Sequence, residues 1–196
     1  MKVGLILEGE PDKAVCKLLV ERLQPGTEVV PLPLGPKQKL IAQCGKVAAT
    51  LFKTGCDCVI ILWDLYPAWG AHGAKPCLKR DREGINKSLT DAAISSSRVH
   101  LVCIHKMLES WLLADERALS EFLSKLKKKR ITVPRVKRPE DPIKPKTVLS
   151  QIARKYANYQ FQAHIDAELI IKEVKDFKRL DQCKSFSYFR LKLADC

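Results

Sequence analysis

The sequence lacks the patterns that mark a membrane protein, a secreted protein or a nucleotide-binding loop. No apolar run approaches the length of a membrane span, and Met1–Leu7 is too short for a signal peptide and leads straight into acidic residues. Neither G-x-x-x-x-G-K-S/T nor G-x-G-x-x-G is present, and Gly9 stands alone where a phosphate-cradling loop needs several glycines. These absences count against an enzyme for phosphorylated metabolites, and we expect a cytoplasmic protein with no membrane partner.

Cysteine is plentiful, yet neither disulfides nor a zinc site are expected. Cys16, Cys44, Cys58 and Cys103 lie inside apolar or helical patterns, where a free cysteine packs as a small hydrophobe. Cys56 and Cys58 form a C-x-C pair, but no second pair of ligands follows at the spacing that zinc sites use. A reducing cytoplasm is the simplest expectation.

Acidic residues are scarce beside basic ones. The chain has 35 Lys and Arg against 22 Asp and Glu, a formal net charge of +13 over 196 residues. Such an excess repels itself unless a polyanion neutralises it, and nucleic acid is the default polyanion. The alternative is a basic surface that only keeps the protein in solution. The apolar content of 46% is ordinary for a globular chain and argues against disorder.

Short apolar runs alternate with helical patterns along residues 1–126. The runs are typical of buried strands and cover Val3–Leu7, Val29–Leu34, Cys58–Trp63 and Val99–Ile104. Two prolines mark the second run as a short or edge strand. Because strand and helix alternate, the sequence predicts an α/β, Rossmann-like sandwich with a mainly parallel four-stranded sheet and helices on both faces.

Residues 127–196 have a different character, and we expect them to form a basic loop and a helical extension packed on the core. Proline interrupts regular structure in Lys127–Pro145, and helices are predicted over Thr147–Tyr156 and Ala163–Val174, before a closing segment, Ser185–Leu193. We expect the basic side chains to bind nucleic acid, although a run of lysines is usually only a solvated face. The predicted binding residues are Lys127, Lys128, Lys129, Arg130, Arg135, Lys137, Arg138, Lys144 and Lys146.

Carboxylates fall where the predicted strands end. Glu8 and Glu10 follow the first strand, Asp64 ends the third, and Glu109 comes soon after the fourth. Ligands of doubly wound sheets bind outside these strand ends. Carboxylates gathered there repel one another unless a cation intervenes, and Mg²⁺ or Mn²⁺ suits oxygen ligands and can activate a phosphodiester. The structural alternative is that Asp64 caps a turn and that Glu10 favours the positive end of a helix.

Several short blocks carry a resemblance to known families. L-I-L-E-G-E-P-D (Leu5–Asp12) resembles the opening of Toprim-type domains, and H-K-M-L-E-S-W-L-L-A-D (His105–Asp115) is similar to a block of a Toprim-like group, DUF4276. Later blocks at Asp141–Leu149, Ala163–Asp166 and Lys184–Phe189 also resemble that group. The order of the blocks along the chain is a stronger signal than any one of them.

The resemblance implies a Toprim-like fold and a magnesium site. In Toprim domains a Glu after strand one and a D-x-D after strand three hold the ion, which implies that Glu8 is a metal ligand or general base and that Asp64 is a ligand. The pattern breaks here, because Tyr66 stands in place of the second Asp. Glu109 could supply the missing carboxylate. Poorer substitutes are Glu10, Asp12 and Asp115.

The expected function is that of a metal-dependent nuclease. Glu8, Asp64 and Glu109 would be catalytic and would hold Mg²⁺ or Mn²⁺, with Glu10 beside them at the metal. A partner ATPase and a role in genome defence or repair are implied by the resemblance alone. The alternative is a Toprim-like module that binds nucleic acid without cutting it, and the missing acid after Asp64 favours this alternative.

Overall fold

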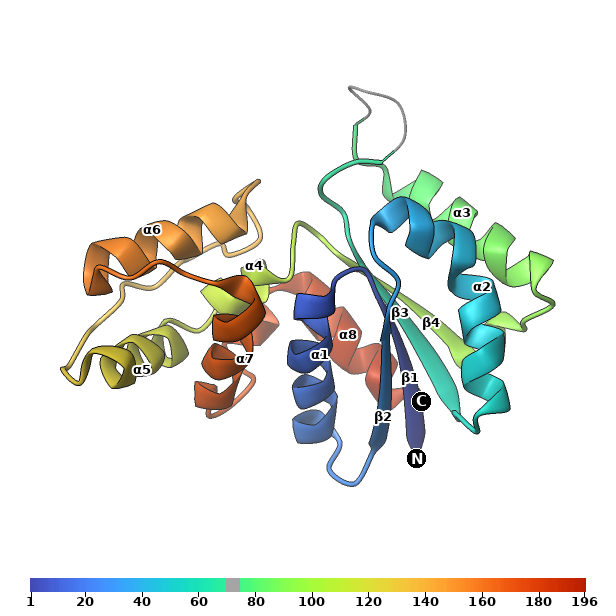
Figure 1. Cartoon of the computed structure of the whole chain (residues 1–196), viewed down its shortest axis with the longest axis horizontal. Helices are drawn as coiled ribbons and strands as arrows, with labels where there is room; N and C mark the ends of the chain where they lie inside the picture. The colour runs from blue at the N-terminus through green and yellow to red at the C-terminus, as the bar shows by residue number, and fades with distance from the viewer. Residues whose placement is uncertain (70–74) are drawn as a thin grey trace. The chain divides into compact units, whose positions relative to one another are not determined.

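Four parallel strands form the only sheet in the part of the chain that the structure, a computed structural model, describes: residues 1–69 and 75–196. The strands are β1 (Lys2–Leu7), β2 (Glu28–Pro33), β3 (Cys58–Asp64) and β4 (Val99–Ile104), and their order across the sheet is β2-β1-β3-β4 (Figure 1). The predicted α/β class and the four-stranded parallel sheet are therefore confirmed.

The position of each strand follows from its composition. β1 and β3 are the central strands, and Leu5 and Ile60, which face each other in the ladder, are both fully buried. A central strand that is covered on both faces favours apolar side chains on both, which explains the uninterrupted apolar runs of β1 and β3. β2 lies at the edge, where Pro31 and Pro33 remove backbone donors at little cost.

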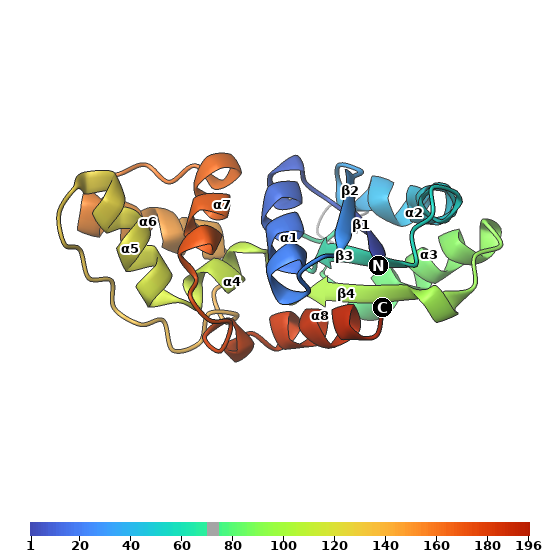
Figure 2. The ribbon, with the colours of Figure 1, turned by 90° about the horizontal axis from the view of Figure 1, so that it is seen from below.

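Helices cover both faces of the sheet. α2 (Lys37–Lys53) and α3 (Leu78–Asp91) pack together on one face over an apolar core that includes Ile61. α1 (Glu10–Leu23) and the last turns of α8 (Lys184–Ala194) lie on the other face (Figures 1 and 2). None of the helices within the described residues is long and apolar enough to cross a membrane.

The chain divides into two compact units. The first comprises residues 1–104 and 188–196, and the second comprises residues 105–187. The predicted domain boundary between residues 126 and 127 stays a prediction. Short 3₁₀ turns occur in each unit, at Ser96–Arg98 and Leu180–Gln182.

The second unit is helical. It contains α4 (Glu109–Leu113), α5 (Glu116–Lys127), α6 (Pro145–Ala157) and α7 (Ala163–Glu173). Asp115 caps α5, because its carboxylate accepts hydrogen bonds from the first backbone N–H groups of that helix at 3.0 and 3.2 Å.

Trp111 anchors the core of this unit. Its ring is fully buried, meets Phe186 edge to face at 5.3 Å, and donates its indole N–H to the Ser185 hydroxyl at 2.8 Å. A buried indole needs such an acceptor, since an unpaired N–H would carry a desolvation cost.

One expectation about cysteine is wrong. Cys58 is not free but forms a disulfide with Cys196, 138 residues further along the chain. The physical reason is that Cys58 begins β3 on the face that α8 covers, so the residues after α8 come to lie beside it. Cys16, Cys44 and Cys103 are free and buried, as expected.

The contact between α2 and α3 depends on a glycine. A Cβ atom on Gly45 would lie 1.9 Å from the carbonyl oxygen of Ser88, and the Gly45 N–H donates to the Ser88 hydroxyl at 3.1 Å. The two helices can approach this closely only because position 45 has no side chain.

Gly45→Ala should therefore destabilise the protein. Forcing the helices apart is overpacking, which typically costs about 1–3 kcal/mol. We expect the midpoint of urea unfolding to fall accordingly, while Gln43→Ala, an exposed change on the same helix, shifts the free energy of unfolding by less than about 0.5 kcal/mol. An unchanged midpoint in Gly45→Ala would contradict this packing.

Candidate functional site

Two of the predicted acids meet at the carboxyl ends of neighbouring strands. Glu8 follows β1 directly and Asp64 is the last residue of β3. The Asp64 backbone N–H donates to the Glu8 carboxylate at 3.0 Å. Since β1 and β3 are adjacent and parallel, the sheet itself brings these two residues together.

Glu8 has an unusual acidity. Burial raises the pKa of this carboxyl to about 7, and the negative charges of Asp12 and Asp81 add to the effect. The nearby Lys37 ammonium and the hydrogen bond from Asp64 act in the opposite direction and lower the pKa. A carboxyl group that titrates near neutral pH is suited to accepting and returning a proton, and such groups concentrate at functional sites.

Lys37 is a member of the site that the sequence analysis missed. It begins α2, is 5% exposed, and donates to the carbonyl oxygens of Leu65 and Pro67 at 2.8 and 2.7 Å. Its ammonium group also lies 3.8 Å from the Asp81 carboxylate. Lysine is rarely buried unless paired, and nothing in the local sequence marks this one as different from a solvated residue at a helix start.

Asp81 links that lysine to two tryptophans. Its carboxylate accepts the indole N–H of Trp63 at 3.2 Å and of Trp69 at 2.6 Å. The Arg80 guanidinium lies over the Trp69 ring, 5.0 Å from its centroid. Asp81 lies in the first turn of α3, so this inward-facing acid interrupts the apolar pattern at the start of the helix.

Gly9 and Asp12 shape the turn after β1. The Asp12 carboxylate accepts the Gly9 backbone N–H at 3.1 Å, and a Cβ at position 9 would lie 2.9 Å from that oxygen. Glycine therefore leaves room for Asp12 beside Glu8. Glu10, by contrast, is exposed and pairs with Lys13 at 3.3 Å. Asp12 is thus one of two acids whose charge acts on Glu8, although the sequence ranked it among the poorer substitutes for the missing carboxylate.

These acids suit a magnesium ion that keeps most of its water. Within the first unit's described residues, the carboxylates of Glu8, Asp12 and Asp64 do not bring three ligand atoms within 4.8 Å of one another. Mg²⁺ is usually bound through one or two carboxylates together with waters, so Glu8 and Asp64 are the residues that could hold it. A cation there would also offset the cost of ionising Glu8.

Glu109 belongs to the second unit, so its convergence with Glu8 and Asp64 stays a prediction. It begins α4 and is 9% exposed, and burial raises the pKa of its carboxyl. The positive charge of Lys146, one of the predicted nucleic-acid-binding residues, lowers that pKa.

The predicted nucleic-acid-binding residues share one property: all of them are exposed. They are Lys127, Lys128, Lys129, Arg130, Arg135, Lys137, Arg138, Lys144 and Lys146. The loop that carries most of them is nevertheless pinned to the unit. Ile131 and Val133 are buried, and their backbone N–H groups donate to the hydroxyls of Ser124 and Ser120, both at 2.9 Å. Charged side chains therefore project from a fixed backbone.

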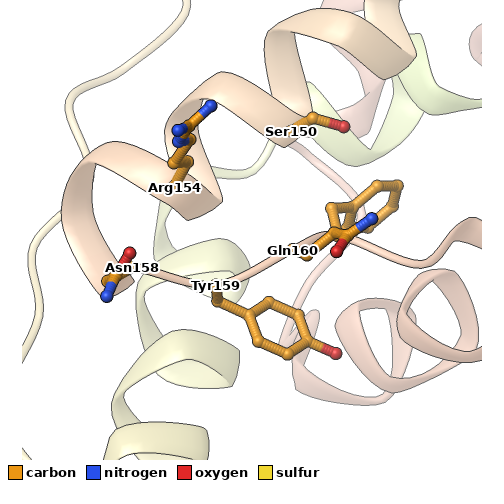
Figure 3. Close-up of a pocket in the computed structure, with 6 residues that line it drawn as sticks. Ser150, Arg154, Asn158, Tyr159 and Gln160 are labelled. Atoms are coloured by element: carbon orange, nitrogen blue, oxygen red, sulfur yellow. The ribbon is translucent and has the colours of Figure 1, made fainter.

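A pocket lies at the end of α6 in the same unit. Its volume is about 610 Å³, and Figure 3 shows Ser150 and Arg154 on the helix and Tyr159 and Gln160 on the segment that follows it. Tyr159 is fixed there, because its hydroxyl donates to Asp166 at 2.9 Å. The remaining lining residues are Asn158, Gln160 and Phe161. Guanidinium, amide and aromatic groups in one pocket can bind a planar polar group.

The comparison with known proteins gives a family. The sequence model of the domain of unknown function DUF4276 matches residues 9–194, nearly the whole chain. The chain belongs to this family. The match includes Asp64 and Glu109 and begins one residue after Glu8. No curated protein and no solved structure matches this DUF4276 chain.

The raised pKa of Glu8 predicts a pH-dependent stability. Because the folded pKa lies above the usual value of 4.5, the neutral form is favoured in the fold, and stability falls as pH rises from about 4.5 through about 7. Glu8→Gln removes this titration. Between pH 5 and pH 8 we expect the free energy of unfolding, measured with urea, to fall less in Glu8→Gln than in the wild type.

Glu21→Gln serves as the control, since Glu21 is an exposed acid on α1 that pairs only at its surface with Lys17. It should retain the wild-type pH dependence. If Glu8→Gln keeps that dependence as well, Glu8 does not have the raised pKa described here.

Proposed function

We propose that this DUF4276 protein is a metal-dependent nucleic-acid phosphodiesterase. The observation that carries the proposal is Glu8, a carboxyl group with a pKa of about 7 that is hydrogen-bonded to the last residue of the neighbouring strand. The net charge of +13 and the exposed basic residues of the second unit support a polyanionic substrate. The resemblance of the β1 turn to Toprim nucleases points the same way.

Each group has a place in the reaction. Mg²⁺ or Mn²⁺, when bound by Glu8 and Asp64, would supply Lewis-acid polarisation of the phosphodiester and a more acidic water. Glu8 serves either as a ligand of the ion or, beside an ion held by Asp64, as the base that accepts the proton of the attacking water. Lys37 opposes the repulsion among the surrounding acids and so sets how readily Glu8 ionises. The basic residues of the second unit hold the strand by its phosphates, and the pocket beside Arg154 receives a base.

A second candidate function is nucleic-acid binding without cleavage. Tyr66 replaces the second acid of the D-x-D pattern, and the carboxylates among the residues described in the first unit do not form a three-ligand group. A site with two protein ligands binds metal more weakly. In that case the same surface would act as a binding module, beside a partner ATPase if the resemblance extends that far. A cytoplasmic location, in which free cysteines stay reduced, is part of both proposals.

The test is a cleavage assay on single- and double-stranded DNA and RNA, with Mg²⁺ or Mn²⁺ against EDTA. Removing a general base typically costs 10²- to 10⁴-fold in rate, so Glu8→Ala should cut at least about 100-fold more slowly. Asp64→Ala should be similarly impaired, whereas Glu21→Ala should cut at the wild-type rate. Binding at moderate salt should survive in all three variants.

Two outcomes would contradict cleavage at the strand-end site. Metal-dependent cutting that persists in both Glu8→Ala and Asp64→Ala would place the activity elsewhere. Binding that weakens steeply with salt, without any cutting, would favour the binding module.

A further inference from the structure

Three metal-ligating side chains meet on the sheet far from the strand-end site. The donor atoms of Cys58, His100 and Cys196 all lie within 4.8 Å of one another. His100 on β4 pairs in register with Ile60 of β3, and Cys58 precedes Ile60 by two residues, so Cys58 and His100 point to the same face of the sheet. Cys196 follows α8, which covers that face.

The two sulfurs are joined in the structure, and this bond decides what the group can bind. As a disulfide, the pair has no thiolate to offer a metal ion. Reduced, the same atoms become two thiolates beside an imidazole. Two sulfur ligands and one nitrogen ligand suit Zn²⁺, with water in the fourth position of a tetrahedron. Soft thiolates also exclude Mg²⁺, which prefers oxygen.

His100 is suited to a ligand role. Its imidazole nitrogen lies within 4.8 Å of both cysteine sulfurs, and imidazole is a common ligand of Zn²⁺. His100 also lines a pocket of about 400 Å³ together with Tyr188 and Lys192, which gives a small ion access.

We propose that Cys58, His100 and Cys196 form a redox-gated zinc site. A dithiol reductant transfers two electrons and two protons to the disulfide, which breaks the S–S bond and leaves two thiols while the reductant becomes a disulfide. Zn²⁺ then displaces both thiol protons and binds the two sulfurs and the imidazole. In the reverse step a small-molecule disulfide oxidant takes two electrons from the two thiolates and two protons from water and becomes two thiols, which restores the Cys58–Cys196 bond and releases the ion. The site is independent of the proposed nuclease centre, because it shares no residue with it.

The experiment uses the full chain, either as the disulfide or reduced with dithiothreitol and desalted under nitrogen, with Co²⁺ as a spectroscopic substitute for Zn²⁺. The reduced protein should show thiolate-to-cobalt charge-transfer absorption that saturates at one ion per chain and disappears when Zn²⁺ is added. The disulfide form should show none. Cys77→Ser, which removes an exposed free cysteine, should bind as the wild type does.

Variants identify the ligands. Cys196→Ser should lose the charge-transfer band. His100→Ala should weaken metal binding by more than about 100-fold, because mutating a residue that only orients a ligand costs at most about 100-fold in metal affinity. His100→Gln, which keeps a polar side chain of similar reach, should weaken it equally if the imidazole is a ligand. Circular dichroism of each reduced variant checks that the fold persists.

The proposal is overturned if the reduced wild type binds neither Co²⁺ nor Zn²⁺ at micromolar concentrations. It is also overturned if Cys196→Ser and both His100 variants bind as tightly as the wild type, since the ion would then occupy another site.

Discussion

The hydrogen bond from the Asp64 backbone to the Glu8 carboxylate joins the ends of the two central strands, and the site's chemistry depends on it. It exists because β1 lies directly beside β3 in the order β2-β1-β3-β4. The same position removes Glu8 from much of the solvent, which is the largest cause of its raised pKa. One feature of topology thus sets both the position and the acidity of the residue.

The local charge at this site opposes the charge of the whole molecule. The chain carries a net +13, yet Asp12 and Asp81 both act on Glu8, with Lys37 as the countering cation. Burying Lys37 is costly unless its ammonium group is fully paired, and two carbonyl oxygens and Asp81 meet that need. A locally acidic site in a strongly basic protein fits the proposed cleavage of a polyanion, because a metal ion needs acidic ligands and a polyanion needs basic ones.

Much of the fold could be predicted from the sequence, because the strands and most helices are set by local patterns. The apolar run of Cys58–Trp63 identifies β3 almost to the residue, and the prolines of β2 identify an edge strand. Glu8 and Asp64 could be predicted as neighbours, since parallel strands bring their carboxyl ends to one edge.

What could not be predicted depends on tertiary contacts. Lys37 reads as a surface lysine until the turn at Leu65 and Pro67 supplies its acceptors. The partner of Cys58 is 138 residues away, and no spacing rule links residues so far apart. The place of Asp12 near Glu8 also depends on a turn, which Gly9 permits and which the amino-acid composition does not reveal.

The central claim is that the strand-end carboxylates bind a divalent cation, and the most direct test is the ionisation of Glu8 itself. Carbon-13 NMR of labelled glutamate side chains follows each carboxyl through a pH titration, with and without Mg²⁺. The account predicts a Glu8 pKa of about 7 in the absence of the ion and a clearly lower value in saturating Mg²⁺, because the cation favours the ionised form. In Asp64→Asn the effect of Mg²⁺ should shrink. A Glu8 pKa that Mg²⁺ leaves unchanged would contradict the account.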